Sequence, residues 1–279
     1  MDRIIYGVVA PPPTQVTALA FGSDVEPALI AGGQGTAYRA GNIILKPAGH
    51  AEEESWTADL FENLPASPEV RFARPIKSVE GTWIHDHYVA WTFLQGNHVN
   101  GQYEKKLAAG KAFHGLLKGI PKPSFLNAPR DSWSAASDVV LERKGFPYDQ
   151  EFVELYNQIK PHLRHLPSDR QPVHGDLSGN FLLDSSLPPA IIDFTPVWAP
   201  NGFAEGIMLA DIIAWEHATD DELKAFTNRA DIGQLAWYGV LRRIAEQPEH
   251  MKWFGKSKEQ AVNEARSFLP VIDFLSSIF

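Results

Sequence analysis

The chain has 279 residues, of which 44% are hydrophobic and 21% are charged, the composition of an ordinary globular protein. Its formal net charge of −9 argues against binding of nucleic acid, which needs a basic surface, and the lack of cysteine excludes disulfides, thiolate zinc sites and cysteine nucleophiles. No apolar run approaches the roughly 20 residues that span a bilayer, and the apolar segment 4–10 is a poor signal peptide because three prolines follow it. We therefore expect a cytoplasmic protein that binds neither nucleic acid nor membrane, with no indication of its oligomeric state.

The first part of the chain has the pattern of a small sheet. After a short helix that ends near Gly22, apolar strands are predicted at 28–30 and 37–39, and a third strand at 43–47 carries Lys46 near its end. The turn between the first two strands contains Gly32, Gly33, Gln34 and Gly35. Glycines let the backbone approach a phosphate closely and point its N–H groups at it, although a turn of this kind is also typical of a plain hairpin.

Lys46 is expected to have a carboxylate partner, because a lysine in a buried strand is costly unless it is paired. The next helix is predicted over 50–64, with an apolar stripe made of Trp56, Leu60 and Leu64. This stripe places Glu53 on the inward face of the helix, and Glu54, one residue further, is the alternative partner.

The pattern changes from strand-like to helix-like near residue 95. Two strands are predicted over 69–93, and the second of them ends at Phe93 and Leu94. We therefore divide the chain after Leu94, into domains 1–94 and 95–279. Helices are then predicted over 103–117, 132–142, 151–165, 202–217, 221–229, 231–246 and 258–278. The fold class is α+β, with a small antiparallel sheet before a mainly helical domain.

The stretch 173–194 carries the chemistry. Two short apolar runs flank the turn-forming residues 184–189, which predicts a hairpin. His174-Gly175-Asp176 precedes the first run, Asn180 opens it, and Asp193 ends the second. The hairpin therefore gathers one carboxylate suited to act as a base and two oxygen ligands of the kind that Mg²⁺ prefers.

This set resembles the catalytic loop and the metal-binding Asp of the protein-kinase-like phosphotransferases, specifically the aminoglycoside phosphotransferase and choline kinase branch. The resemblance implies a two-lobed kinase-like fold and transfer of the γ-phosphate of ATP to a hydroxyl of a small molecule. It implies that the phosphates contact Gly32–Gly35 and Lys46, and that adenine meets the backbone of Phe93 and Leu94. Asn180 and Asp193 would hold Mg²⁺, Asp176 would take the acceptor's proton, and His174 would brace the loop.

The sequence departs from the family at one important place. Asp176 and Asn180 are four residues apart, where the family has five.

Asp211, on the helix predicted over 202–217, is expected to brace the catalytic loop through main-chain N–H groups.

Two other functions stay open. One is a nucleotide-binding protein that has lost transfer activity and works through a partner, which the short Asp–Asn spacing keeps possible. The other is a metal-dependent phosphohydrolase with His174, Asp176 and Asp193 as ligands, which leaves Lys46 and the glycine turn without a role. The sequence does not identify the acceptor.

Overall fold

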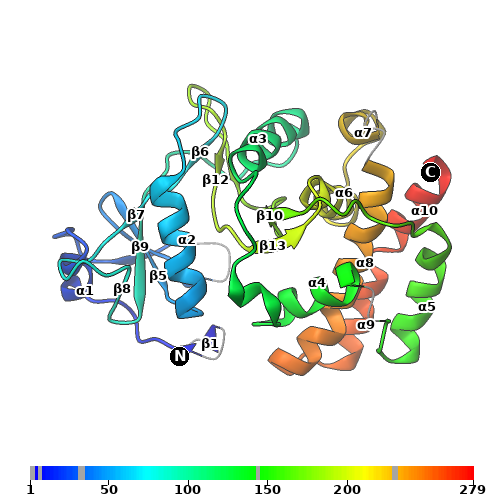
Figure 1. The fold of residues 1–279 in the computed structure, drawn as a ribbon, viewed down its shortest axis with the longest axis horizontal. Coiled ribbons are helices and arrows are strands. Elements are labelled where there is room, and N and C mark those ends of the chain that lie inside the picture. The colour runs from blue at the N-terminus through cyan, green and yellow to red at the C-terminus, as the bar shows by residue number, and fades with distance from the viewer. Residues whose placement is uncertain (1–3, 6–7, 31–34, 143–144, 228–231) are drawn as a thin grey trace. The chain divides into compact units, whose positions relative to one another are not determined.

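The computed structural model describes the whole chain except residues 1–3, 6–7, 31–34, 143–144 and 228–231 (Figure 1). It contains two compact units: unit 1 comprises residues 1–66 and 71–95, and unit 2 comprises residues 67–70 and 96–279. An antiparallel sheet dominates unit 1 and helices dominate unit 2, which confirms the predicted α+β class. Among the described residues, no helix is long and apolar enough to cross a membrane.

Six of the described strands in unit 1 form one antiparallel sheet, in the order β3-β4-β5-β9-β7 with β8 also paired to β9. These strands are β3 (Ala28–Leu29), β4 (Tyr38–Ala40), β5 (Ile43–Pro47), β7 (Pro75–Ile76), β8 (Ile84–His85) and β9 (Tyr88–Thr92). The short strands β1 (Ile4–Ile5) and β2 (Val8–Val9) pair with each other, and β6 covers Arg71–Phe72. The helices of unit 1 are α1 (Gln15–Ala20) and α2 (Ala51–Asn63).

The two faces of β5 have different environments. Ile43 and Leu45 belong to a buried apolar cluster with Phe21 and Tyr88. Because side chains alternate along a strand, Lys46 lies on the opposite face of the sheet. This second face carries Trp91, whose ring meets Phe61 of α2 edge-on at a centroid distance of 5.7 Å. Lys46 therefore lies on the face of the sheet that α2 covers.

Helices make up most of unit 2 and pack around one of them, α8. They are α3 (Tyr103–Leu116), α4 (Ser132–Glu142), α5 (Gln150–Ile159), α6 (Phe203–Ala214), α7 (Asp220–Thr227), α8 (Ile232–Phe254), α9 (Lys258–Arg266) and α10 (Leu269–Ile278). Two antiparallel strand pairs accompany them, β10 (Gln171–His174) with β13 (Pro196–Ala199) and β11 (Phe181–Leu182) with β12 (Ala190–Ile191). Helices α4, α5, α6, α9 and α10 all contact α8 (Figure 1).

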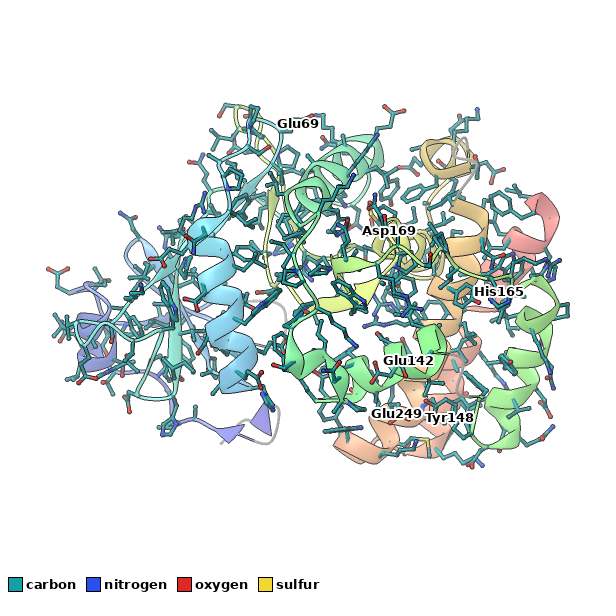
Figure 2. The ribbon with its side chains drawn as sticks, in the orientation of Figure 1. Glu69, Glu142, Tyr148, His165, Asp169 and Glu249 are labelled. Atoms are coloured by element: carbon teal, nitrogen blue, oxygen red, sulfur yellow. The ribbon has the colours of Figure 1, made fainter. Side chains whose placement is uncertain are left out.

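Helix α8 is longer than the sequence predicts, because it continues through Pro248 to Phe254. The turn that contains the proline is anchored by Glu249, which is buried and accepts a hydrogen bond from the Tyr148 hydroxyl at 2.8 Å (Figure 2). Lys252 donates to the same carboxylate. These tertiary contacts offset the main-chain hydrogen bond that proline cannot make.

Helices α6 and α8 cross at two glycines with their backbones in direct contact. A Cβ at Gly206 would lie 2.3 Å from the Leu235 carbonyl oxygen, and a Cβ at Gly239 would lie 2.4 Å from the carbonyl group of Gly206. Any larger residue at either position separates the helices. The crossing matters because Arg243 follows Gly239 by one turn and lies against Asp211 of α6.

We expect Gly239→Ala to lower the free energy of unfolding by about 2–3 kcal/mol, because backbone atoms cannot rotate away from the added methyl group. The matched control is Gly115→Ala in α3, where no atom lies within 4 Å of the new Cβ. Alanine is the better helix former by about 1 kcal/mol at most, so this control should leave stability unchanged or raise it slightly. Urea unfolding measures both variants, and equal effects would contradict the close crossing.

Candidate active site

Two strand pairs hold the loop 174–180. In the first pair, His174 of β10 lies opposite Pro196 of β13. In the second, Phe181 of β11 lies opposite Ile191 of β12, which confirms the predicted hairpin. The Ile192 N–H donates to the Asn180 carbonyl at 3.0 Å, so Asn180 lies beside the residue that precedes Asp193.

Gly175 lies where the chain has no room for a side chain. Its N–H donates to the Thr195 carbonyl at 2.8 Å, and a Cβ at this position would lie 2.5 Å from a methyl group of Val197. The strand that follows Asp193 therefore packs directly on the turn between His174 and Asp176. This contact is the physical reason for glycine in the His-Gly-Asp motif.

His174 is fully buried and joins the two halves of the site. Its Nδ1 accepts the Asp176 N–H at 3.1 Å, and its Nε2 lies 2.9 Å from the Ile192 carbonyl, to which it donates in the neutral tautomer. Its own N–H donates to Nε2 of His114, a buried histidine of α3. Burial lowers the pKa of His174 to about 4, although its hydrogen bond to Ile192 opposes the shift. His174 is therefore neutral at pH 7, and both ring nitrogens have partners.

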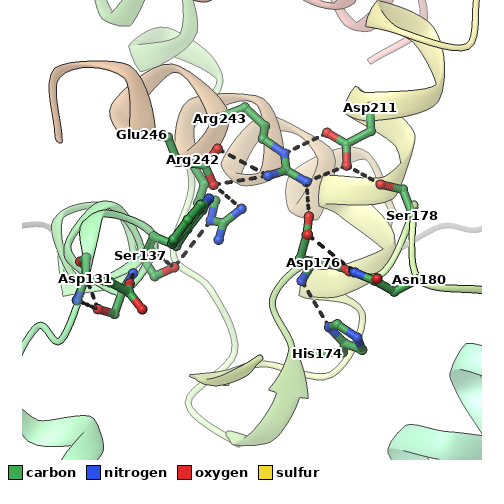
Figure 3. Close-up of polar contacts among 12 residues, drawn as sticks. Asp131, Ser137, His174, Asp176, Ser178, Asn180, Asp211, Arg242, Arg243 and Glu246 are labelled. Atoms are coloured by element: carbon green, nitrogen blue, oxygen red, sulfur yellow. Dashed lines mark hydrogen bonds and ion pairs between the residues drawn. The ribbon is translucent and has the colours of Figure 1, made fainter. Parts of the chain in front are cut away.

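A buried arginine holds the Asp176 carboxylate (Figure 3). Nη2 of Arg243 donates to Oδ1 of Asp176 at 2.7 Å and to Oδ2 of Asp211 at 2.6 Å, and Nε donates to Oδ1 of Asp211 at 2.7 Å. Nη1 donates to both oxygens of Glu246, at 3.1 and 3.2 Å. The Asp176 side chain is 44% exposed, whereas those of Arg243 and Asp211 are 4% and 2% exposed. The Asp176 carboxylate thus reaches solvent while the residues that hold it are buried.

The charges in this cluster fix the protonation of its members. Burial works to raise the pKa of Asp176, but the Arg243 guanidinium outweighs it, so that this pKa lies below its usual value. Burial also works against the charge on Arg243, and the three carboxylates outweigh it and raise the pKa of Arg243 further. Asp176 is therefore an anion at neutral pH, as an acceptor for a hydroxyl proton must be.

Asn180 closes the shortened loop. Its Nδ2 donates to the Asp176 carbonyl at 2.6 Å and lies 3.4 Å from Oδ2 of the same residue. Because the amide nitrogen faces Asp176, the amide oxygen is directed elsewhere and keeps its capacity to bind a cation. Asp193 has an exposed side chain and a left-handed backbone with φ of 54°, a conformation that Asp tolerates better than most residues. Its backbone turns the chain from β12 towards β13.

Asp211 braces the loop by different contacts from those predicted. It accepts the Ser178 hydroxyl at 2.5 Å and the two nitrogens of Arg243, where the sequence analysis expected main-chain N–H groups. Arg243 is not among the site residues predicted from the sequence. The signal for it is a pair of arginines, 242 and 243, inside the otherwise apolar stretch 235–245, because such cations need buried carboxylates as partners.

In unit 1 the structure favours Glu54 over the predicted Glu53 as the partner of Lys46. The buried residues of α2 are Thr57, Ala58 and Phe61, which places Glu54 on the face that packs against the sheet. Burial lowers the pKa of Lys46 to about 8, and the Glu54 carboxylate opposes this shift. Burial raises the pKa of Glu54, although the Gly49 N–H donates to it at 3.0 Å.

The remaining predicted nucleotide contacts are described in part. Gly32, Gly33 and Gln34 lie outside the described residues, whereas Gly35 has a φ of 63°, which only glycine adopts readily. The Phe93 N–H donates to the Asn42 carbonyl at 2.8 Å, as an extension of the pairing between β5 and β9. Of the two predicted adenine contacts, Leu94 is therefore the one with a main-chain N–H that does not serve the sheet.

Several solved structures with a similar fold are small-molecule kinases. A spectinomycin phosphotransferase bound to AMP aligns over 94% of this chain and 96% of its own, with 16% identity and a TM-score of 0.60. An amicoumacin kinase in complex with AMP-PNP and Ca²⁺ covers 93% and 92% of the two chains, with 16% identity and a TM-score of 0.59. Choline kinase from Streptococcus pneumoniae covers 94% and 97%, with 14% identity and a TM-score of 0.54. Comparisons with protein-family models and with curated protein sequences find no match.

The fold is therefore that of the aminoglycoside phosphotransferase and choline kinase branch of the kinase-like proteins, as the sequence resemblance implies.

The buried, neutral His174 should make the protein less stable in weak acid. The unfolded chain takes up a proton at His174 near pH 6.5, and the folded chain does so only near pH 4. Lowering the pH from 7 to 5 therefore favours unfolding by about 2 kcal/mol through this residue. We expect His174→Asn to reduce the pH dependence of the unfolding free energy by that amount. The exposed His165 gives the control, His165→Asn, and parallel pH curves for wild type and His174→Asn would contradict the assignment.

Proposed function

We propose that the chain is a phosphotransferase that moves the γ-phosphate of ATP to a hydroxyl group of a small molecule. The observation that carries the proposal is the ionised Asp176 carboxylate, held by Arg243 and exposed beside the hairpin that bears Asn180 and Asp193. The likeness in fold to small-molecule kinases supports it.

The nucleotide contacts in this proposal come from unit 1. The ammonium of Lys46 pairs with the phosphates, and Glu54 sets its position and charge. Gly32–Gly35 are the residues proposed to bind the phosphates, and the backbone of Leu94 is proposed to contact adenine.

The donor set in unit 2 fits a magnesium ion. Asn180 and Asp193 provide one amide oxygen and one carboxylate at the same end of the hairpin, and Mg²⁺ is commonly bound by one or two carboxylates together with waters and substrate phosphates. Among the described residues no three His, Cys, Asp or Glu side chains form a metal cluster. When bound, the ion neutralises charge on the phosphates.

The chain itself contributes positioning and one proton acceptor. Oδ1 of Asp176 is bound to Arg243, so Oδ2 is the oxygen that accepts the hydroxyl proton of the acceptor. The acceptor oxygen forms a bond to the γ-phosphorus, the bond between that phosphorus and the β–γ bridging oxygen breaks, and ADP leaves. His174 holds Asp176 and Ile192 by their main chains and takes no part in proton transfer, because both its ring nitrogens are occupied. The same occupancy argues against a phosphohydrolase with His174 as a metal ligand.

The first test is a comparison of ATP binding and turnover. ATP with Mg²⁺ should raise the melting temperature, since a ligand that binds only the native state stabilises it. Asp193→Ala should abolish the Mg²⁺-dependent part of this rise, whereas Asp184→Ala, at the turn of the same hairpin, should retain it. Asp176→Asn should bind ATP normally and lose about 10²–10⁴-fold in rate.

The outcomes of this test separate the candidate functions. An ATP-dependent shift with no phosphate transfer to any compound in a broad panel of alcohols, amino alcohols and sugars would favour a nucleotide-binding protein without transfer activity. The absence of any shift would contradict both functions.

A second test concerns the partner of Lys46. We expect Glu54→Gln to weaken ATP binding by about 10-fold, because loss of its charge lets burial lower the pKa of Lys46 further and leaves the amine less fully charged. Glu53→Gln is the matched variant, one residue away on the same helix. Calorimetric titration with ATP measures both, and a larger loss for Glu53→Gln would restore Glu53 as the partner.

A further inference from the structure

Arg243 uses all its hydrogen-bonding capacity on three carboxylates. A guanidinium has five N–H donors. In Arg243 the Nε donor and one Nη2 donor bind the two oxygens of Asp211, the second Nη2 donor binds Asp176, and Nη1 binds Glu246. With these contacts made and its side chain 4% exposed, Arg243 has no donor left for a substrate. Any effect that it has on phosphate transfer is therefore indirect, and its bond to Asp176 is the direct route to a partly exposed carboxylate.

The supports of Arg243 are themselves fixed. Asp211 is tied to the catalytic loop by the Ser178 hydroxyl at 2.5 Å, and Glu246 lies one turn further along α8 and also pairs with Arg242. The close crossing of α6 and α8 at Gly206 and Gly239 leaves little freedom for either helix to shift. The guanidinium therefore presents Nη2 to Asp176 from one fixed direction.

The orientation of the Asp176 side chain depends on Arg243 more than the orientations of the buried Asp211 and Glu246 side chains do. Its side chain is 44% exposed, and besides Arg243 only the longer contact with Asn180, at 3.4 Å, is made to its carboxylate by a described side chain. An exposed aspartate that lacks a fixed partner samples several rotamers. The pair with Arg243 selects one rotamer and leaves Oδ2 with the longer contact from Asn180.

We propose that Arg243 is a positioning residue for phosphate transfer, which holds Oδ1 of Asp176 so that Oδ2 meets the acceptor hydroxyl. This inference rests on the proposed function. It predicts that arginine is required at this position, because lysine has the charge but lacks the planar fork that reaches Asp211 and Asp176 together. It also predicts that Arg243 matters only while Asp176 can act as a base.

The experiment is a double-mutant cycle on the rate of ATP consumption, with water as the acceptor so that no particular substrate is needed. The variants are Asp176→Asn, Arg243→Lys and the combination of both, assayed by ADP release with Mg²⁺. We expect Arg243→Lys to lower kcat by about 10–100-fold with KM for ATP within about 2-fold, and the double variant to be no slower than Asp176→Asn alone. ATP-dependent thermal shifts show that each variant is folded and binds the nucleotide.

Arg242 provides the matched control. It is the preceding residue, fully buried on the same helix, and it pairs with Glu246. Arg242→Lys should lower kcat by less than Arg243→Lys, and its effect should multiply with that of Asp176→Asn.

If Arg243→Lys does not fold, Asp176→Glu tests the same contact from the other side. It keeps the charge and the arginine but moves the carboxylate by one methylene, and it should lose at least about 10-fold in kcat.

Three results would overturn the inference. In an active protein, multiplicative effects of Arg243→Lys and Asp176→Asn would show that Arg243 acts elsewhere, and wild-type activity in Asp176→Glu would show that the carboxylate needs no fixed position. Both leave the proposed function intact. A wild-type chain that binds ATP but neither hydrolyses nor transfers its phosphate would overturn the proposed function, and the role of Arg243 with it.

Discussion

The site in unit 2 depends on one buried cation. Arg243 brings together Asp176 from the loop 174–180, Asp211 from α6 and Glu246 from its own helix. A cluster of this kind is costly to bury, and breaking it by removing one partner leaves an uncompensated charge in the interior. Its value for the protein lies in geometry, because a saturated guanidinium fixes the direction of a partly exposed carboxylate and keeps it ionised.

The main chain supplies the second constraint. Gly175 lets β13 pack on the turn before Asp176, and Gly110 lets Leu177 of the loop approach α3, where a Cβ would lie 3.0 Å from its methyl group. His174 then ties the loop to Ile192, the residue before Asp193. Loop and hairpin are thus held by close packing at these glycines and by the hydrogen bonds of His174, while the Asp176 side chain stays 44% exposed. The loop from Asp176 to Asn180 is one residue shorter than the family pattern and keeps this arrangement. The Asn180 amide donates a hydrogen bond across it to the Asp176 carbonyl.

Local patterns were enough to predict the hairpin, the change from strands to helices near residue 95 and the strand that carries Lys46, because turn residues and alternation act over a few positions. They failed at α2, whose buried face contains Thr57 and Ala58 and is therefore less hydrophobic than the stripe through Trp56 and Leu60. They also failed at Arg243, which lies 67 residues from Asp176 and reaches it only because two helices cross closely at glycines. Neither contact leaves a periodic signal in the sequence.

Phosphate transfer by this chain is tested most directly by ³¹P nuclear magnetic resonance of the wild-type protein with ATP, Mg²⁺ and a mixed pool of small hydroxyl compounds. The account predicts a new phosphomonoester resonance that grows as the γ-phosphate signal of ATP declines and ADP appears. An ATP spectrum that stays unchanged over many hours, under conditions where nucleotide binding is detected, would contradict it.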